Sequence, residues 1–129
     1  MTGSFEAWAP YSTATGAFAP GSEYQVKSDL DQQEDIIVAY NTGAGSDFTS
    51  GVPLNFQHAM SQVIIKALNK DASTTKIEVA GIRLNNLKNT GTLDHVTTPT
   101  TSGTFAWPDG AWTLSSPTAI YNVGSTTAN

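Results

Sequence analysis

Short runs of alternating apolar and polar residues recur along the chain, separated by clusters of Gly, Pro, Asn, Asp and Ser. Because apolar stripes at helical spacing are scarce, this pattern predicts a protein made mostly of β-strands. The run at 4–9 alternates and ends before Pro10, which has no N–H for a sheet ladder, so we predict an edge strand there. The run "DIIVAYN" is almost continuously apolar, which is typical of a central strand covered on both faces.

The stretch "VPLNFQHAMSQVIIKALN" alternates at both of its ends, but the two halves are out of phase. The apolar face of Leu54 and Phe56 does not continue into that of Val63 and Ile65. Side chains of a strand alternate with a strict period of two, so a change of phase needs an inserted residue or a turn. We therefore predict a short helical turn, or a wide bulge, near residues 57–62.

Two hairpins are predicted farther along the chain. The polar turn "KDAST" separates "QVIIKALN" from "TKIEVAGIRL", a spacing that suits an antiparallel hairpin, and Gly81 in the second arm predicts a bulge. In "TFAWPDGAWTL", Pro108 and Asp109 predict a type I turn followed by a left-handed Gly110. That hairpin would carry large apolar side chains on both faces, so one face must be covered by a loop, a missing segment or a partner chain.

The segment "AIYNVG" predicts a last strand, and "STTAN" a frayed end. Eight or nine short strands without alternating helices predict an all-β fold, an antiparallel β-sandwich. A length of 129 residues suits one domain, so we predict a single β-sandwich domain over residues 1–129.

Composition narrows the functional classes. Only 13% of the residues are charged, the net charge is −5, and the six basic residues are scattered between Lys27 and Lys88, which argues against nucleic-acid binding. No apolar run approaches the roughly 20 residues that span a bilayer, so no membrane span is expected. The absence of cysteine excludes disulfides and thiolate metal sites. The start "MTGSFEAW" lacks signal-peptide features, so such a peptide is expected to be absent or already removed.

His58 and Ser61 are the strongest candidates for catalysis. They lie three residues apart, and a base beside a hydroxyl is the start of a nucleophilic site. Such a pair also needs an orienting carboxylate and an oxyanion hole, which the sequence does not indicate. We therefore favour a structural interpretation, in which a buried His58 hydrogen-bonds nearby backbone in the predicted turn, and we do not expect an enzyme.

Metal and cofactor sites are not predicted either. The two histidines, His58 and His95, have no evident reason to meet. An acidic loop could offer oxygen ligands to calcium but lacks EF-hand spacing, so a solvated loop is favoured; its carboxylates are Asp29, Asp31, Glu34 and Asp35. Glycines at 43, 45 and 51 lack the Lys-Ser/Thr pair and the helix of a phosphate-binding loop.

The tryptophans are the remaining candidates. Exposed indole rings anchor protein interfaces and stack on sugars. Trp8, Trp107 and Trp112 are therefore possible interface or glycan contacts, although core positions are the more frequent role for this residue.

Several stretches together resemble a known family. "DIIVAYN", "VPLNFQHAMSQVIIKALN" and "KIEVAGIRLNNLKNTGTLD" are similar to the N-terminal domain of the fimbrillin family, the type V pilus subunits and Mfa-like surface proteins. The resemblance covers about residues 35–94, with a weaker match at "SFEAWAPY". Its specific elements are P-L-x-F-x-H-A-[LM]-S/A and the later G-[IV]-x-[IVL]-x-N-[IVL]-x-x-x-G-T.

The resemblance implies a transthyretin-like β-sandwich, usually followed by a second such domain, in a secreted lipoprotein carried to the outer membrane. It also implies other pilus subunits as partners, joined by donor-strand exchange. The alternative partner is a host or bacterial surface protein or glycan. This sequence departs from the family in lacking a lipobox cysteine, a strand before "FEAW" and a second domain. The function expected is a non-catalytic structural subunit or adhesin of fimbriae, as the N-terminal domain or a fragment of a longer protein. The alternative is an extracellular glycan-binding module that uses Trp107 or Trp112.

Overall fold

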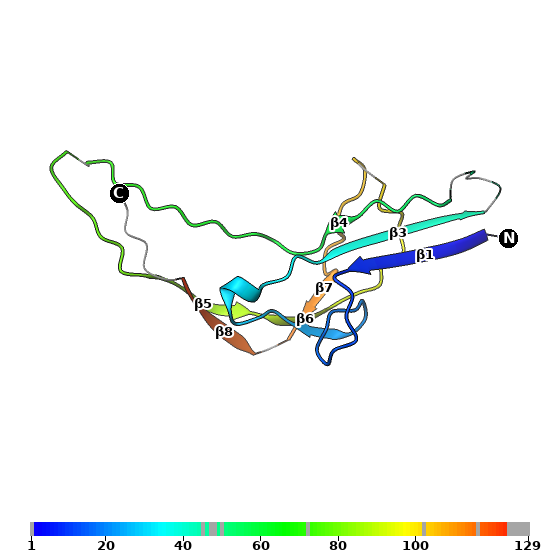
Figure 1. Cartoon of the computed structure of the whole chain (residues 1–129), viewed down its shortest axis with the longest axis horizontal. Helices are drawn as coiled ribbons and strands as arrows, with labels where there is room; N and C mark the ends of the chain where they lie inside the picture. The colour runs from blue at the N-terminus through cyan, green and yellow to red at the C-terminus, as the bar shows by residue number, and fades with distance from the viewer. Residues whose placement is uncertain are drawn as a thin grey trace.

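The fold is an antiparallel β-structure in two layers (Figure 1). The computed structural model describes residues 2–44, 46, 49, 51–71, 73–101, 103–115 and 117–123. Its elements are β1 (Thr2–Ala9), β2 (Glu23–Gln25), the 3₁₀ turn η1 (Leu30–Gln32), β3 (Ile37–Ala44), β4 (Gln57–His58), β5 (Ile82–Lys88), β6 (Thr90–Leu93), β7 (Trp112–Leu114) and β8 (Thr118–Val123). The strand orders are β1-β3-β4, β2-β6-β7 and β5-β8. The predicted all-β sandwich is confirmed.

The first layer is the sheet β1-β3-β4. β1 pairs with β3 along its whole length, from Thr2 opposite Ala44 to Ala9 opposite Ile37. β1 is an edge strand and β3 is central, as the sequence predicts. The neighbouring Val38 and Ala39 point to opposite faces of β3 and are both fully buried, so this strand is covered on both sides. β3 also extends to Ala44, into the segment expected to be a loop.

The second layer is a long ribbon with β2 at one side. β6 pairs with β7, and β5 pairs with β8, so the two successive strands 82–93 run antiparallel to 112–123. The ribbon has one irregularity between Leu84 and Leu87, where Asn86 adopts a positive φ of 58°. The bulge therefore lies at this point of β5, whereas Gly81, where we predicted it, precedes the strand.

The predicted hairpin at "TFAWPDGAWTL" is wrong in its pairing. The turn forms, with Ala111 N donating to Pro108 O at 3.1 Å and a left-handed Gly110 at φ 77°. However, β7 pairs with β6 and not with residues 104–107. The reason is that the indole N–H of Trp107 donates to the His58 carbonyl at 2.8 Å, which holds the first arm against the other sheet.

The predicted hairpin around "KDAST" is also wrong. A turn forms there, with Thr75 N donating to Asp71 O at 3.0 Å. The two arms then separate, because the first continues from β4 in one layer and the second continues into β5 in the other (Figure 1). Between 61 and 81 the only described residue in a β-bridge is Val79.

The prediction of a helical turn at residues 57–62 is wrong. The phase of the chain changes there by another means. Gln57 and His58 form β4, and the chain bends at Met60. The carbonyls of His58 and Ala59 accept the indole N–H groups of Trp107 and Trp112, both at 2.8 Å. Because side chains take these consecutive carbonyls, the strand ends and the chain resumes in another phase.

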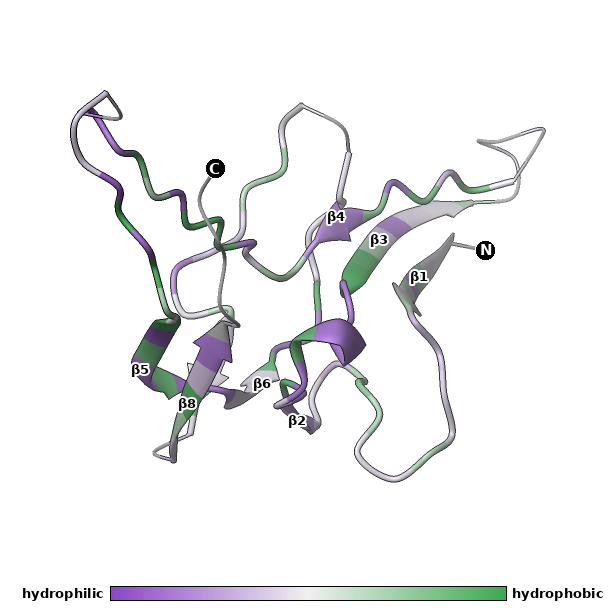
Figure 2. Cartoon of the chain, turned by 60° about the vertical axis from the view of Figure 1, so that its left-hand side comes forward, coloured by the Kyte–Doolittle hydropathy of each residue, from purple (hydrophilic) through white to green (hydrophobic). Residues whose placement is uncertain are grey.

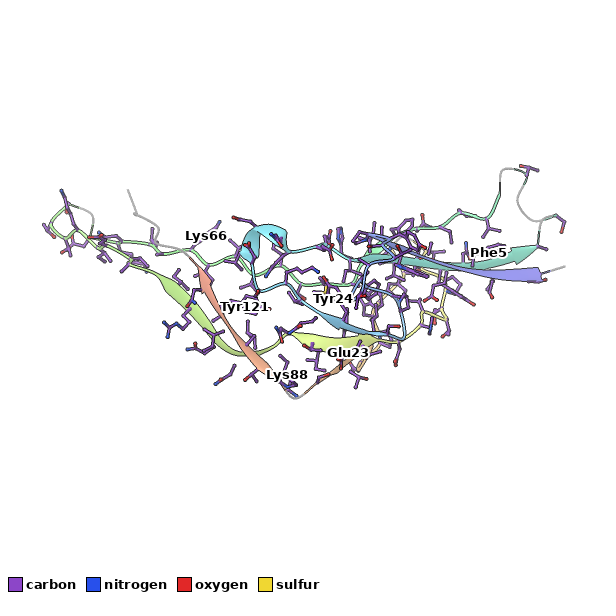
Figure 3. The ribbon with its side chains drawn as sticks, turned by 60° about the horizontal axis from the view of Figure 1, so that its bottom comes forward. Phe5, Glu23, Tyr24, Lys66, Lys88 and Tyr121 are labelled. Atoms are coloured by element: carbon purple, nitrogen blue, oxygen red, sulfur yellow. The ribbon has the colours of Figure 1, made fainter. Side chains whose placement is uncertain are left out.

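The core lies between the layers, where Phe18, Tyr24, Ile36, Val38, Leu93 and Val96 are buried together. Side chains crowd around Tyr24 and become sparse toward Lys66 and Tyr121 (Figure 3). The ring of Tyr24 meets Phe18 edge-on, with centroids 5.7 Å apart, and its hydroxyl donates to Glu34 Oε2 at 3.0 Å.

The stability of the fold should fall at alkaline pH because of Tyr24. Burial, and then the Glu34 carboxylate, raise the pKa of Tyr24 from 10.0 to about 12. The folded state therefore keeps a proton that the unfolded chain loses, so this contribution is complete below pH 10 and is lost as the pH rises toward about 12. Urea unfolding across this pH range should show the fall, and Tyr24→Phe should reduce it. An equal fall in the variant would contradict the assignment.

Candidate functional site

The three tryptophans lie at the core margin and not on one exposed surface. Trp8 lies opposite Val38 in the first sheet, and Trp107 and Trp112 both hold the kink after β4. All three are half-buried and pack against the core cluster. The structure thus brings Trp107 and Trp112 together on one backbone segment, while Trp8 reaches the core from β1.

His58 is exposed, contrary to the prediction that it would be buried. Its side chain is 73% exposed, and its Nδ1 lies 2.7 Å from Asp35 Oδ2. The side chain points away from the core because His58 neighbours the inward-packed Ala59 in the chain. An exposed pair of this kind contributes about 0–1 kcal/mol to stability. Ser61 is also exposed, and it borders the groove described below.

The carboxylates of the acidic loop are used separately. Asp29 Oδ1 accepts from Asp31 N at 3.0 Å at the start of η1, Glu34 accepts from Tyr24, and Asp35 meets His58. Within the described residues, no three His, Cys, Asp or Glu side chains gather in an arrangement that could hold a metal. The described part also contains no helix long and apolar enough to cross a bilayer.

A different feature is the best candidate for a functional site: the backbone segment 61–68, which we call the free arm. Its residues are all exposed, and it makes no strand pairing within the part of the chain that the structure describes. Val63 is 66% exposed and Leu68 is 78% exposed. Five of its eight residues are apolar, and they form the green stretches of this part of the chain in Figure 2.

The free arm forms one wall of a groove, and the ribbon β5-β8 forms the other. The groove has a volume of about 540 Å³. Val63, Ile65 and Ala67 line it from the arm, while Leu84 and Tyr121 line it from the ribbon. Ile64 and Leu68 alternate with the lining positions and lie outside it. A smaller apolar hollow of about 400 Å³ adjoins it toward Trp112.

The groove lies where one strand of each layer ends within the described part of the chain. β4 pairs with the first residues of β3, which begins at Ile37. The free arm follows β4 in the chain and therefore extends past the start of β3. β2 ends at Gln25, so β5 extends beyond the strand that flanks β6, and among the described strands it pairs with β8 alone. Unpaired backbone beside apolar side chains is a site that another strand can complete.

Sequence reasoning missed this groove although it recognised the alternation that forms it. The runs "VIIKAL" and "KIEVAGIRL" were assigned to each other as a hairpin, which would have satisfied their backbone and covered their apolar faces. The available signal was the phase break before Val63, because a strand that changes phase also changes the neighbours it can pair with.

These observations define a β-sandwich protein in which the described strands leave the sheet open at one end. The chain belongs to the fimbrillin-like family, whose family model matches residues 2–128. That family comprises structural subunits of fimbriae, so the chain is a protein of the fimbrial, cell-surface type whose partners are other subunits. No curated protein and no solved structure shows a significant match to the chain.

Proposed function

We propose that this protein is a non-catalytic structural subunit or adhesin of fimbriae that assembles by β-strand addition in the groove between the free arm and β5-β8. The observation that supports this most is the free arm itself, eight exposed residues whose backbone pairs with no described strand and whose apolar side chains line the groove. An incoming strand would pair with this backbone and place alternate side chains in the groove.

The dimensions suit one strand. Eight residues of extended chain span about 26 Å, at about 3.3 Å per residue. Exposed apolar residues on an unpaired edge favour aggregation in a lone protein, so their presence here supports a regular partner. Membership of a family of fimbrial subunits supports a second subunit as the source of that strand.

The test uses two neighbouring residues of the free arm. A fluorescent eight-residue peptide of alternating valine and threonine should bind the protein in a polarisation assay. Ile65→Asp should weaken this binding about tenfold or more, because it places a charge in the groove. Ile64→Asp is the matched control, since Ile64 is also exposed but does not line the groove, and it should change affinity by less than about twofold.

The proposal is wrong if the peptide does not bind the unmodified protein, or if the two aspartate variants weaken binding equally. Circular dichroism of both variants checks that they fold, which is expected because both positions are exposed.

A further inference from the structure

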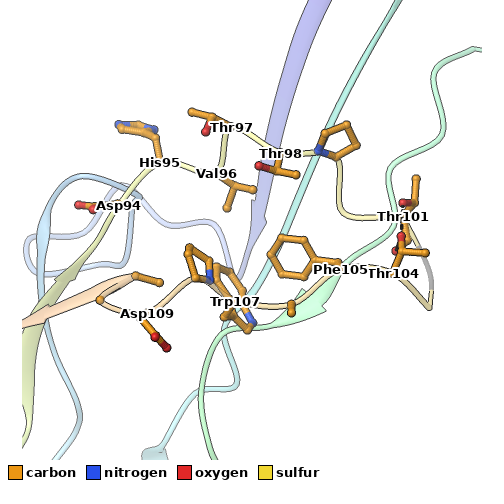
Figure 4. A pocket seen from close by; sticks show the side chains of 15 residues that line it. Asp94, His95, Val96, Thr97, Thr98, Thr101, Thr104, Phe105, Trp107 and Asp109 are labelled. Atoms are coloured by element: carbon orange, nitrogen blue, oxygen red, sulfur yellow. Dashed lines mark hydrogen bonds between the residues drawn. The ribbon is translucent and has the colours of Figure 1, made fainter.

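A second groove, of about 780 Å³, is enclosed by the long connection between β6 and β7 (Figure 4). Its described lining residues all lie between 94 and 111, and none of them lines the groove of the free arm. We propose that this second groove binds an uncharged oligosaccharide, with a sugar ring stacked beside Trp107 and Phe105.

The aromatic side of the groove is rigid. Phe105 and Trp107 meet edge-to-face, with ring centroids 5.0 Å apart. The indole N–H of Trp107 donates to His58 O at 2.8 Å, so the ring cannot rotate freely. Both rings are half-buried and both line the groove. A fixed aromatic surface binds the C–H face of a pyranose at a low entropic cost, because little side-chain freedom is lost.

The remaining lining supplies polar groups. One stretch of the connection presents the exposed Asp94, His95, Thr97 and Thr98, and Asp109 is exposed beyond Trp107 (Figure 4). Hydroxyls both donate and accept, and carboxylates accept from sugar hydroxyls. A mixture of apolar rings and a few polar groups is typical of small-ligand sites.

The loop that carries these groups is held at both of its sides. Glu6 of β1 accepts from Val96 N at 3.0 Å, and its other oxygen lies 2.7 Å from His95 Nδ1. Thr100 is buried and hydrogen-bonds Tyr40 of β3. The groove is therefore positioned by the first sheet and does not depend on a ligand for its shape.

The charges select the kind of sugar. All six basic residues lie between Lys27 and Lys88, so none lines this groove, whereas two carboxylates do. A sialylated or sulfated glycan would meet like charge, with no Lys or Arg in the described lining to compensate it. An uncharged oligosaccharide fits the same surface without that cost.

The test is calorimetric titration of the protein with mannotetraose, cellotetraose and lacto-N-tetraose, and with sialyllactose as the anionic probe. At least one uncharged probe should bind, and more tightly than sialyllactose. Thr98→Arg should weaken that binding about tenfold, because the larger side chain fills the groove from an exposed position. Thr13→Arg, at an exposed position outside the groove, is the matched control and should leave binding within about twofold.

The inference is overturned if no uncharged probe binds at about 10 mM, if sialyllactose binds equally well, or if both arginine variants bind like the unmodified protein. Thermal unfolding of the two variants shows whether they remain folded. If Thr98→Arg does not fold, Thr97→Arg takes its place as the groove variant. These outcomes leave the strand-addition proposal untouched, because it concerns the other groove.

Discussion

Replacing Trp112 with alanine should lower the free energy of unfolding by about 3–5 kcal/mol, the usual cost of removing a large aromatic ring from a core. Trp112 packs against the core cluster, with its ring 6.1 Å from that of Phe18. Its N–H also donates to Ala59 O at 2.8 Å, so the substitution leaves that carbonyl without its partner. Urea unfolding followed by circular dichroism measures the loss.

Two further variants separate packing from the hydrogen bond. Trp112→Phe keeps an aromatic ring but removes the indole N–H, so it should cost less than the alanine variant. Leu114→Ala, in the same strand, removes a side chain that is 51% exposed and should cost about 1 kcal/mol or less. If Trp112→Ala is at least as stable as Leu114→Ala, the indole of Trp112 does not hold the kink after β4.

The tryptophans illustrate how far a single sequence predicts a site. Their abundance in core positions favoured a structural role, and the structure places all three against the core. Which carbonyls Trp107 and Trp112 would reach could not be predicted, because each bond spans about fifty residues of chain, from 107 to 58 and from 112 to 59. The exposure of His58 could not be predicted for the same reason. It depends on the contact with Asp35, 23 residues away in the chain, and on how β4 pairs with β3.

Strands and turns were predicted better than their partners. The apolar run of β3 is typical of a strand covered on both faces, so its central position is predictable from the sequence. The turn at Pro108 to Gly110 is predictable as well, because these residues have strong local turn preferences. Neither predicted hairpin pairs as expected, because sequence proximity favours neighbouring arms while the fold pairs β6 with β7 and β5 with β8. Alternation indicates that a segment can pair, but it does not indicate with which strand, or whether that strand is present.

The free arm is an example of a segment whose partner strand the sequence does not indicate. Its apolar residues at 63, 65 and 67 share one face, as they would in a strand, yet the described strands of both layers end before they reach it. In a closed sandwich the same residues would be a core strand. Here the apolar positions at 63 and 65 remain exposed, so the described side chains pack densely at the end that holds Tyr24 and sparsely at the end that holds Lys66 (Figure 3).

Replacing Thr100 with valine should lower the free energy of unfolding by about 2–4 kcal/mol, although the two side chains have nearly the same volume. Thr100 is buried, and its hydroxyl accepts from Tyr40 N at 3.0 Å and lies 2.6 Å from Asn55 O. It thereby fills the position of a missing ladder bond between β3 and the segment before β4. Valine leaves the N–H of Tyr40 and the carbonyl of Asn55 without this partner, and losing the partner of a buried group costs about 1–3 kcal/mol.

Thr97→Val is the matched control, because Thr97 belongs to the same connection but is exposed, so its substitution should change stability by about 0.5 kcal/mol or less. Thr100→Ser should retain most of the stability, since the hydroxyl remains. If Thr100→Val were as stable as Thr97→Val, the hydroxyl could not be what joins the two segments. If Thr100→Ser were as unstable as Thr100→Val, packing of the methyl group would outweigh the hydrogen bonds. The expected order therefore tests whether a single buried hydroxyl holds the connection of the second groove to β3.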